Sequence, residues 1–376
     1  MRSVRIALLA GAAVVLIALF FHEKIARKTP DLEVYWRAAV RARAAEPLYR
    51  VEDQHYQFKY LPAFAVLALP LGFVSLGAAK TVWFILSLGL IAALVALSLR
   101  VLPEQRKPLR LLLGIAILAM GKFYGHELVL GQVNALLGVV VLLALVAMRR
   151  GREAQAGVLI ALAIVVKPYA AIFLPWLLAR RRTGSIAAAA LGVVAVLALP
   201  ALVYGWTGNI EQHRAWWQTV TGSTAPNLTN ADNVSVAGMY AKWLGTGGAV
   251  TILAGATVAL LLVAAIVMFV QRGRVRFPEG LEAGLLLTLI PLCSPQGWDY
   301  VFLLSTPAVL FIANYEDRLP GVLRLLTIVA IAAIGLSIYD VMGRAAYGAF
   351  MAWSLVTVCY FVVVAAICAL RSRAAA

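Results

Sequence analysis

Long apolar runs constrain this chain more than any other feature. Stretches of roughly 17 to 25 apolar residues recur along it, the length that a helix needs to cross the hydrocarbon core of a bilayer. Lipid offers no hydrogen bonds to backbone amides, so helices are the expected element. Of the 376 residues, 63% are hydrophobic and 13% are charged, whereas a soluble domain is about half apolar and a quarter charged. The sequence predicts an all-α integral membrane protein.

Clusters of Lys and Arg separate the apolar runs. The net charge of +16 would suggest nucleic acid binding in a soluble protein, but the positive-inside rule accounts for it in a membrane protein. No nucleic acid partner is therefore expected. Placing every basic cluster in the cytoplasm predicts that both termini are cytoplasmic. The predicted spans are residues 5–21, 80–99, 111–124, 130–148, 185–204, 249–270, 280–293, 301–314, 321–338 and 347–370.

Two segments do not fit simple spans. Residues 155–179 have basic clusters on both sides, and Pro168 inside them cannot donate a backbone hydrogen bond. We expect two half-helices that form a re-entrant hairpin, broken at Lys167-Pro168. Residues 61–77 contain two prolines and are predicted to be interfacial or re-entrant. With the hairpin counted as two, about twelve membrane helices are expected in a single domain covering residues 1–376.

The predicted outer loops hold most of the acidic residues and all four histidines. The two largest are residues 22–60, expected to be helical or irregular, and residues 205–245. Asp31 follows the first span by a few residues and is therefore expected at the membrane surface. There it could act as a general base that removes the proton of an acceptor hydroxyl, or it could cap a helix.

Basic residues surround Asp31 in the sequence. Asp31 and Glu33 could pair on a metal ion, but no metal is expected, because nearby cations could neutralise a phosphate instead. Lys167 lies inside the apolar hairpin, where an ionisable group is costly unless it has a function. It either binds a phosphate or reaches water or a carboxylate.

Other polar residues lie at the predicted outer ends of spans. Gln132 and Asn134 follow His126 and could bind sugar hydroxyls or join helices. Asn233 belongs to an Asn/Asp cluster suited to a polar ligand. Asp299 follows Trp298 in a polar turn and is a sugar contact or a helix cap. No phosphate-binding loop or dinucleotide motif is present, so nucleotide-driven chemistry has no support.

Taken in order, several segments resemble the polyprenol-phosphate-mannose-dependent transferases of glycosyltransferase family 87, which have the GT-C fold. The resemblance covers about residues 5–315. The segments that carry it are Asp31 with Tyr35, Pro47-Leu48-Tyr49, Phe58 to Pro62 leading to Pro70, Gly131 to Asn134, Lys167-Pro168, Asn233 to Ser235, and Ser294-Pro295 with Trp298.

The resemblance implies a GT-C type helical bundle that uses a polyprenyl-phosphate-linked sugar, usually mannose, without a cofactor or metal, and inverts the anomeric centre. Asp31 lies where the family has its proposed catalytic acid. Candidates for the carrier phosphate are Arg27, Lys28, Lys59 and Lys167. Candidates for the sugar or the acceptor are Tyr35, Tyr60, His126, Gln132, Asn134, Asn233, Trp298 and Asp299. Family members often carry histidine where this chain has Asp299; that residue, His126 or His55 could take its place.

The sequence thus predicts transfer of a hexose, mannose first, from polyprenyl phosphate to a lipid or glycan acceptor. The site is expected at the outer face of a bacterial cytoplasmic membrane. An alternative is a transporter or flippase of lipid-linked sugars with its site near the broken helix. A third reading is a non-catalytic scaffold, for which the outer acidic residues would be superfluous.

Overall fold

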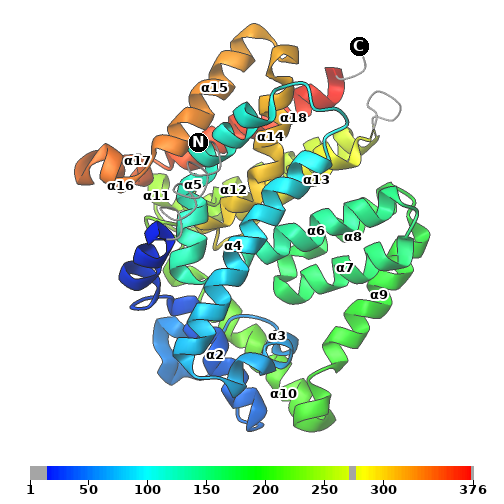
Figure 1. Cartoon of the computed structure of the whole chain (residues 1–376), viewed down its shortest axis with the longest axis vertical. Helices are drawn as coiled ribbons and strands as arrows, with labels where there is room; N and C mark the ends of the chain where they lie inside the picture. Colours follow the sequence, from blue (N-terminus) through cyan, green and yellow to red (C-terminus); the bar gives the residue numbers. More distant parts are fainter. Residues whose placement is uncertain (1–14, 271–276, 374–376) are drawn as a thin grey trace, which may run out of the picture.

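The structure is a computed structural model that describes residues 15–270 and 277–373 (Figure 1). These ranges contain helices but no β-strand, only one isolated bridge between Asn233 and Trp298. The predicted all-α class is therefore confirmed. The predicted first span, residues 5–21, lies mostly outside the described residues.

Four described helices are long and apolar enough to cross a membrane. They are α4 (Leu76–Arg100), α5 (Leu109–Leu130), α12 (Gly248–Val270) and α18 (Leu355–Arg373). A fifth span could be formed by α9 (Thr183–Ala198) and α10 (Ala201–Gly222) together, which are bent by 87°. The expected count of about twelve is not confirmed, because most other helices are too short for a span of about 20 residues.

The shorter helices connect these spans and pack against them. Residues 61–77 form two short helical segments rather than a span, in agreement with the interfacial or re-entrant prediction. Much of residues 205–245, predicted to be a loop, is helical in α10 and α11. The predicted span 347–370 is interrupted near Ser354.

The shorter α-helices are α2 (Pro30–Arg43), α3 (Pro62–Leu67), α6 (Asn134–Arg149), α7 (Glu153–Val166), α8 (Phe173–Ala179), α11 (Val236–Leu244), α13 (Glu279–Cys293), α14 (Thr306–Tyr315), α15 (Gly321–Leu336), α16 (Tyr339–Met342) and α17 (Arg344–Ala352). Short 3-10 segments include η4 (Pro168–Ile172) and η6 (Asp299–Ser305).

The predicted hairpin break lies where the sequence indicated. Helix α7 ends at Val166, and Lys167 has an extended backbone (φ −150°, ψ 122°). Pro168 then opens η4, which leads into α8. The residue before a proline is disfavoured in helical conformation, which explains why the chain turns at Lys167.

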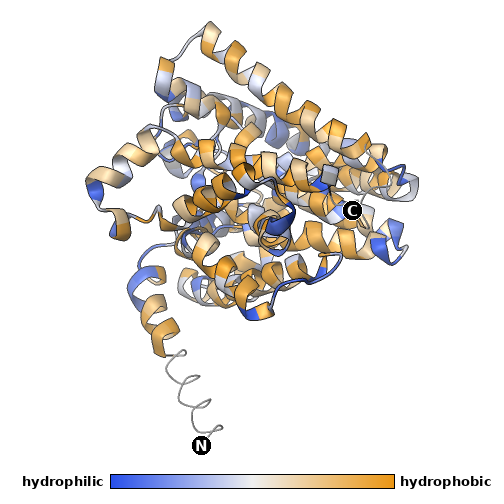
Figure 2. Ribbon diagram, turned by 90° about the horizontal axis from the view of Figure 1, so that it is seen from above, coloured by the Kyte–Doolittle hydropathy of each residue, from blue (hydrophilic) through white to orange (hydrophobic). Residues whose placement is uncertain are grey.

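Hydrophobic residues predominate along most of the helices (Figure 2), and many of them are exposed. Ile252 and Leu260 on α12 are 72% and 70% exposed, and Leu191 on α9 is 73% exposed. A soluble protein rarely exposes apolar surface of this extent. The exposed face fits contact with lipid tails, as expected for a multi-pass membrane protein.

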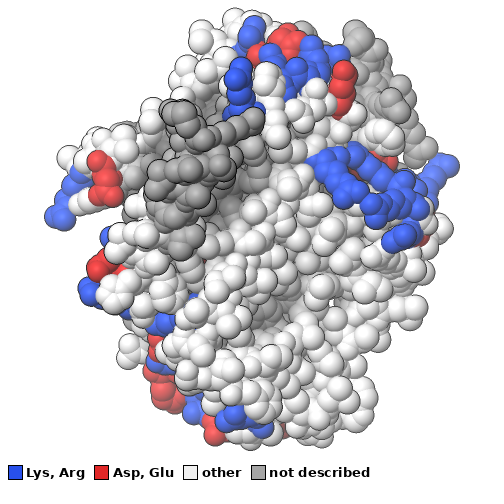
Figure 3. Space-filling view, in the orientation of Figure 1, with Lys and Arg blue, Asp and Glu red and all other residues white. Residues whose placement is uncertain are grey.

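The basic loops meet at one end of the bundle. Arg106 pairs with Asp317 at 2.8 Å, and Lys107 pairs with Glu316 at 2.9 Å. In Figure 3 the basic side chains form separate groups with a broad uncharged surface between them. Further contacts at this end join Arg324 to Glu316, Arg149 to the Val101 carbonyl oxygen, and Arg182 to Glu153.

A buried ion cluster ties three distant segments together at the same end. Glu282 on α13 is fully buried and pairs with Arg180, which follows α8, and with Arg371 on α18. The indole nitrogen of Trp176 donates a hydrogen bond of 2.9 Å to the same carboxylate. A buried carboxylate requires such partners, because an uncompensated charge inside a protein is costly.

Candidate active site

The start of α2 fixes the position of Asp31. Thr29 has a left-handed backbone (φ 67°), and its amide donates a 3.1 Å hydrogen bond to the Val129 carbonyl oxygen at the end of α5. Pro30 occupies the first turn of α2, where its missing N–H costs nothing. Asp31 therefore follows a rigid turn that is attached to α5.

Gly131 brings the start of α2 and the end of α5 together. Its φ is 73°, and a Cβ atom there would lie 2.8 Å from Cβ of Leu32. Only glycine fits both conditions without strain. The next residue, Gln132, can therefore donate a 2.6 Å hydrogen bond from Nε2 to Oδ2 of Asp31.

We expect Gly131→Ala to lower the free energy of unfolding by about 1–2 kcal/mol from the left-handed backbone alone, with a further loss from the contact with Leu32. The change should appear as a lower midpoint of thermal unfolding in nanodiscs. Gly121→Ala is the matched control, because this α5 position has open space around it. Equal midpoints for the two variants would contradict the role of Gly131.

A chain of hydrogen bonds continues from Gln132 to the tip of the hairpin. Lys167 Nζ donates to Oδ1 of Asn134 at 2.7 Å and to Oε1 of Gln132 at 3.4 Å. Asn134 Nδ2 in turn donates to Oε2 of Glu127 at 2.8 Å. Glu127 is fully buried, and its other oxygen accepts from the amide of Ala135 at 2.7 Å. This carboxylate holds the Asn134 amide in the orientation that presents oxygen to Lys167.

Aromatic side chains form the wall around these polar groups. The hydroxyl groups of Tyr35 and Tyr60 are 2.7 Å apart, and their rings meet edge to face at 5.0 Å. The ring centres of Tyr60 and Tyr169 lie 5.9 Å and 6.0 Å from Nζ of Lys167. Gln132 also donates to the hydroxyl of Tyr300 at 3.3 Å. Rings and hydroxyl groups of this kind suit the faces and edges of a sugar.

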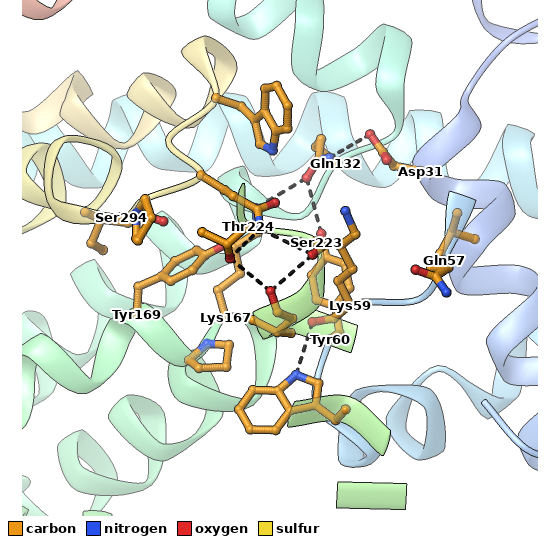
Figure 4. Close-up of a pocket in the computed structure, with 18 of the residues that line it drawn as sticks. Asp31, Gln57, Lys59, Tyr60, Gln132, Lys167, Tyr169, Ser223, Thr224 and Ser294 are labelled. Atoms are coloured by element: carbon orange, nitrogen blue, oxygen red, sulfur yellow. Dashed lines mark hydrogen bonds between the residues drawn. The ribbon is translucent and has the colours of Figure 1, made fainter. Parts of the chain in front are cut away.

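Asp31, Gln132, Lys167 and the four tyrosines line one cavity of about 600 Å³ (Figure 4). Helix α10 closes its other side, where Gln296 Nε2 donates to the hydroxyl oxygens of Ser223 and Thr224 at 3.3 Å and 3.0 Å. The volume is typical of small-molecule sites. Apolar side chains that also line the cavity are Ile172, Val220, Ile290 and Cys293.

Burial shifts the pKa values of two charged side chains in the cavity. Burial raises the pKa of Asp31, although the hydrogen bond from Gln132 and the charges of Lys167 and Lys59 partly oppose this shift. Burial also lowers the pKa of Lys59, and the Asp31 charge works against that change. The cavity thus combines one carboxylate with two lysines, the groups needed to move a proton and to bind an anion.

The chain is similar in sequence to known proteins. The model of glycosyltransferase family 87 matches residues 58–295. This chain belongs to glycosyltransferase family 87. It is also similar to the polyprenol-phosphate-mannose-dependent alpha-(1-2)-phosphatidylinositol mannoside mannosyltransferase of Mycobacterium tuberculosis (strain ATCC 25618 / H37Rv). The two are 28% identical over 333 residues, which cover 81% of this chain and 74% of the relative.

The family 87 match includes most of the cavity. Lys59, Gln132 and Lys167 fall within the matched residues, whereas Asp31 precedes them. Family membership makes this chain a membrane glycosyltransferase, as the sequence predicted.

Not every predicted site residue of this glycosyltransferase faces the cavity. Tyr35, Tyr60, Gln132 and Trp298 line it with Asp31, Lys59 and Lys167. Arg27 and Lys28 are not among the described lining residues. The Arg27 side chain is 65% exposed and lies 3.6 Å from Glu23. Asn134 is fully buried and acts on the cavity through Lys167.

Three further candidates pack behind the cavity. His126 Nδ1 lies 3.4 Å from Oδ2 of Asp299, a buried carboxylate that is also 3.9 Å from Lys122. The amide of Asn233 donates to the carbonyl oxygens of Asn227 and Pro295, and its oxygen accepts from the Ser235 amide. These hydrogen bonds of Asn233 fix the turn that carries Trp298. None of these three side chains is among the described lining residues.

The sequence did not predict two contributors to the candidate active site, Glu127 and helix α10. Glu127 is absent from the predicted site residues, although an ionisable residue in an apolar helix is itself a signal. Helix α10 was missed because its aromatic and polar residues suggested a loop. Its contacts with the cavity come from Trp216, Val220, Ser223 and Thr224.

Proposed function

We propose that this glycosyltransferase transfers a hexose from a polyprenyl-phosphate donor to a lipid or glycan acceptor with inversion of the anomeric centre. Mannose is the preferred candidate for the hexose. One observation carries the proposal: Asp31 and Lys167 face the same cavity and contact opposite ends of the Gln132 amide. A carboxylate base and a cation for the leaving group are thereby separated by one side chain.

Asp31 supplies the general base. Its Oδ2 is held by Gln132, and no other side-chain hydrogen bond to Asp31 is found among the described residues. The other oxygen, Oδ1, takes the proton of the acceptor hydroxyl while the acceptor oxygen attacks the anomeric carbon. The bond from that carbon to the phosphate oxygen breaks, and its electron pair stays on the phosphate. The products are the new glycoside and polyprenyl phosphate.

Lys167 and Lys59 bind the carrier phosphate. An ammonium group has three N–H donors, and two of those on Lys167 are directed to Asn134 and Gln132. The remaining donor is available to the phosphate, whose charge grows as the glycosidic bond breaks. A positioned cation stabilises such a transition state more than the ground state. The apolar residues of the cavity wall lie where the prenyl chain would enter.

The basic end of the bundle supports an outer position for the cavity. Helix α5 begins at Leu109, next to Lys107 in the basic group, and ends at Leu130, next to Gln132 in the cavity. Basic loops remain preferentially in the cytoplasm. The cavity at the opposite end of α5 would then open on the outer face of the cytoplasmic membrane, with both termini inside.

A transfer assay tests the proposal directly. Purified protein in nanodiscs receives radiolabelled polyprenyl-phosphate-mannose, or the glucose analogue, together with extracted membrane lipids. We expect label to move from the donor to lipid or glycan products, with mannose preferred. Donor binding without any transfer would contradict the enzyme assignment for these substrates, and label crossing sealed vesicles would support the transporter alternative.

The pH profile provides a second test. Transfer needs the carboxylate form of Asp31, and burial raises the pKa of this group. As pH falls, kcat should therefore decline at a higher pH than an ordinary aspartate would give. The lowered pKa of Lys59 predicts a weaker donor affinity at a lower alkaline pH than an ordinary lysine would give. A rate that stays constant until the pH nears an ordinary aspartate pKa would contradict the role of Asp31.

A further inference from the structure

A second groove lies on another face of α10. It has a volume of about 490 Å³ and is lined by Leu197 at the end of α9 and by Asn209, Ile210, His213, Arg214, Trp217 and Gln218 of α10. The spacing of these α10 residues places them along one side of the helix. Residues of the same helix that line the active-site cavity point to a neighbouring side.

Asn209 presents an unused acceptor at this groove. The side chain is only 6% exposed, and Nδ2 donates to the Leu197 carbonyl oxygen at 3.0 Å. This contact fixes the amide orientation, because the reverse orientation would bring two oxygens together. Oδ1 is consequently left buried with no hydrogen-bond partner among the described residues. A buried acceptor without a donor is costly.

His213 presents a second unused hydrogen-bond acceptor at the groove. Its Nδ1 lies 2.9 Å from the backbone oxygen of Asn209 and must therefore carry the hydrogen of the neutral ring. Nε2 is then a bare acceptor, and it too is buried without a partner in the described part of the chain. Two neighbouring side chains thus lack donors on the same side of α10.

The rest of the groove is suited to a hydroxylated ring. Trp217 is 62% exposed and offers an indole face beside the two acceptors. Arg214 and Gln218 add donors to the same lining. Hydroxyl groups can donate to the orphan acceptors and accept from Arg214, whereas a phosphodiester anion offers no donor to Asn209.

We propose that this groove is a saccharide-binding subsite that holds a distal sugar of the acceptor while the reacting hydroxyl occupies the cavity next to Asp31. The proposal rests on the proposed function for the identity of the acceptor. The subsite itself is specified by the two orphan acceptors and the exposed indole. Residues of α10 line both the groove and the cavity.

A site-specific binding measurement tests the subsite without any transfer. Protein labelled with 5-fluorotryptophan in phosphatidylcholine nanodiscs is titrated with methyl α-mannobioside, with octyl α-mannobioside, and with phosphatidylglycerol in the bilayer. The Trp217→Phe and Trp206→Phe variants assign the two fluorine resonances. Trp206 is the matched control, since it is 70% exposed on the same helix but is not among the described groove residues.

We expect a saturable shift of the Trp217 resonance with both mannobiosides, no shift of the Trp206 resonance, and loss of the effect in Asn209→Leu. A shift with the octyl glycoside alone would assign the ligand to a membrane glycolipid rather than a free glycan. No saturable shift with either sugar, or the same shift with phosphatidylglycerol, would overturn the proposal. If Asn209→Leu does not fold, the exposed Arg214→Ala variant, which keeps the Trp217 resonance, decides in its place.

Transfer kinetics separate the subsite from the catalytic proposal. Trp217→Ala should raise KM for a disaccharide-bearing acceptor about fivefold, as expected from loss of one aromatic contact. Its kcat and the donor KM should not change, and Trp206→Ala should match the wild type. A lowered kcat with unchanged acceptor KM would overturn the subsite. Absence of transfer in the wild type would count against the proposed function alone, because the fluorine titration is independent of turnover.

Discussion

Asp31→Asn is expected to lower kcat roughly a hundred- to ten-thousand-fold, the usual contribution of a positioned general base. Asparagine keeps the shape of the side chain and can still contact Gln132, but it cannot accept the acceptor proton. The measurement is the initial rate of label transfer from polyprenyl-phosphate-mannose, compared at equal amounts of folded protein. Donor affinity should change much less than kcat, because Asp31 acts on the acceptor.

Glu33→Gln is the matched control for that variant. Glu33 lies on the same helix but pairs with Arg37 at 2.5 Å and is not among the described cavity residues. An exposed ion pair of this kind contributes little to stability. Glu33→Gln should therefore transfer sugar at nearly the wild-type rate. Equal activity of Asp31→Asn and Glu33→Gln would remove Asp31 from the mechanism.

Lys167→Met is expected to lower kcat by about a hundred- to a thousand-fold, comparable to removal of one positioned transition-state donor. Methionine has a similar length but carries no charge and no donor for the leaving phosphate. Single-turnover transfer measured at saturating donor separates this loss of kcat from a loss of donor affinity. Lys80→Gln is the control, because this lysine is only partly buried, is not among the described cavity residues, and donates only to the Ala26 carbonyl oxygen in the described part of the chain.

A double variant distinguishes chemistry from folding at Lys167. The single change leaves Glu127 buried without its nearby cation, which by itself destabilises the protein. Lys167→Met combined with Glu127→Gln removes both charges and should recover much of the thermal stability. Activity should stay low in the double variant. Recovery of transfer together with stability would show that Lys167 is structural.

Local chemistry made parts of the fold predictable. Pro168 imposes the hairpin break by its own covalent structure, and long apolar runs define α4, α5 and α12. The helical character of α10 depends on distant partners that sequence does not show. Gln212 accepts from the Leu48 amide at 3.2 Å, and Trp216 donates to the Lys59 carbonyl oxygen at 3.2 Å. The count of about twelve membrane helices is not confirmed for a similar reason, since packing decides where a helix ends.

The candidate site was predictable as a set of residues but not as a network. Asp31, Gln132 and Lys167 were each recognised, yet the hydrogen bonds that connect them join positions 101 and 35 residues apart. The role of Gly131 depends on a close approach to Leu32 that only the folded chain reveals. Arg27 and Lys28 are near Asp31 in sequence, but proximity along the chain does not determine which side chains share a cavity.

The Glu282 cluster also constrains the order in which the bundle is completed. During synthesis Arg180 is added before Glu282, and Arg371 is added 89 residues after Glu282. Domains form progressively from the N-terminal side as the chain emerges. The hairpin can therefore dock on α13 through Arg180 before α18 has been synthesised, whereas α18 can add its cation only after a further 89 residues. Completion of the Glu282 cluster consequently follows docking of the hairpin.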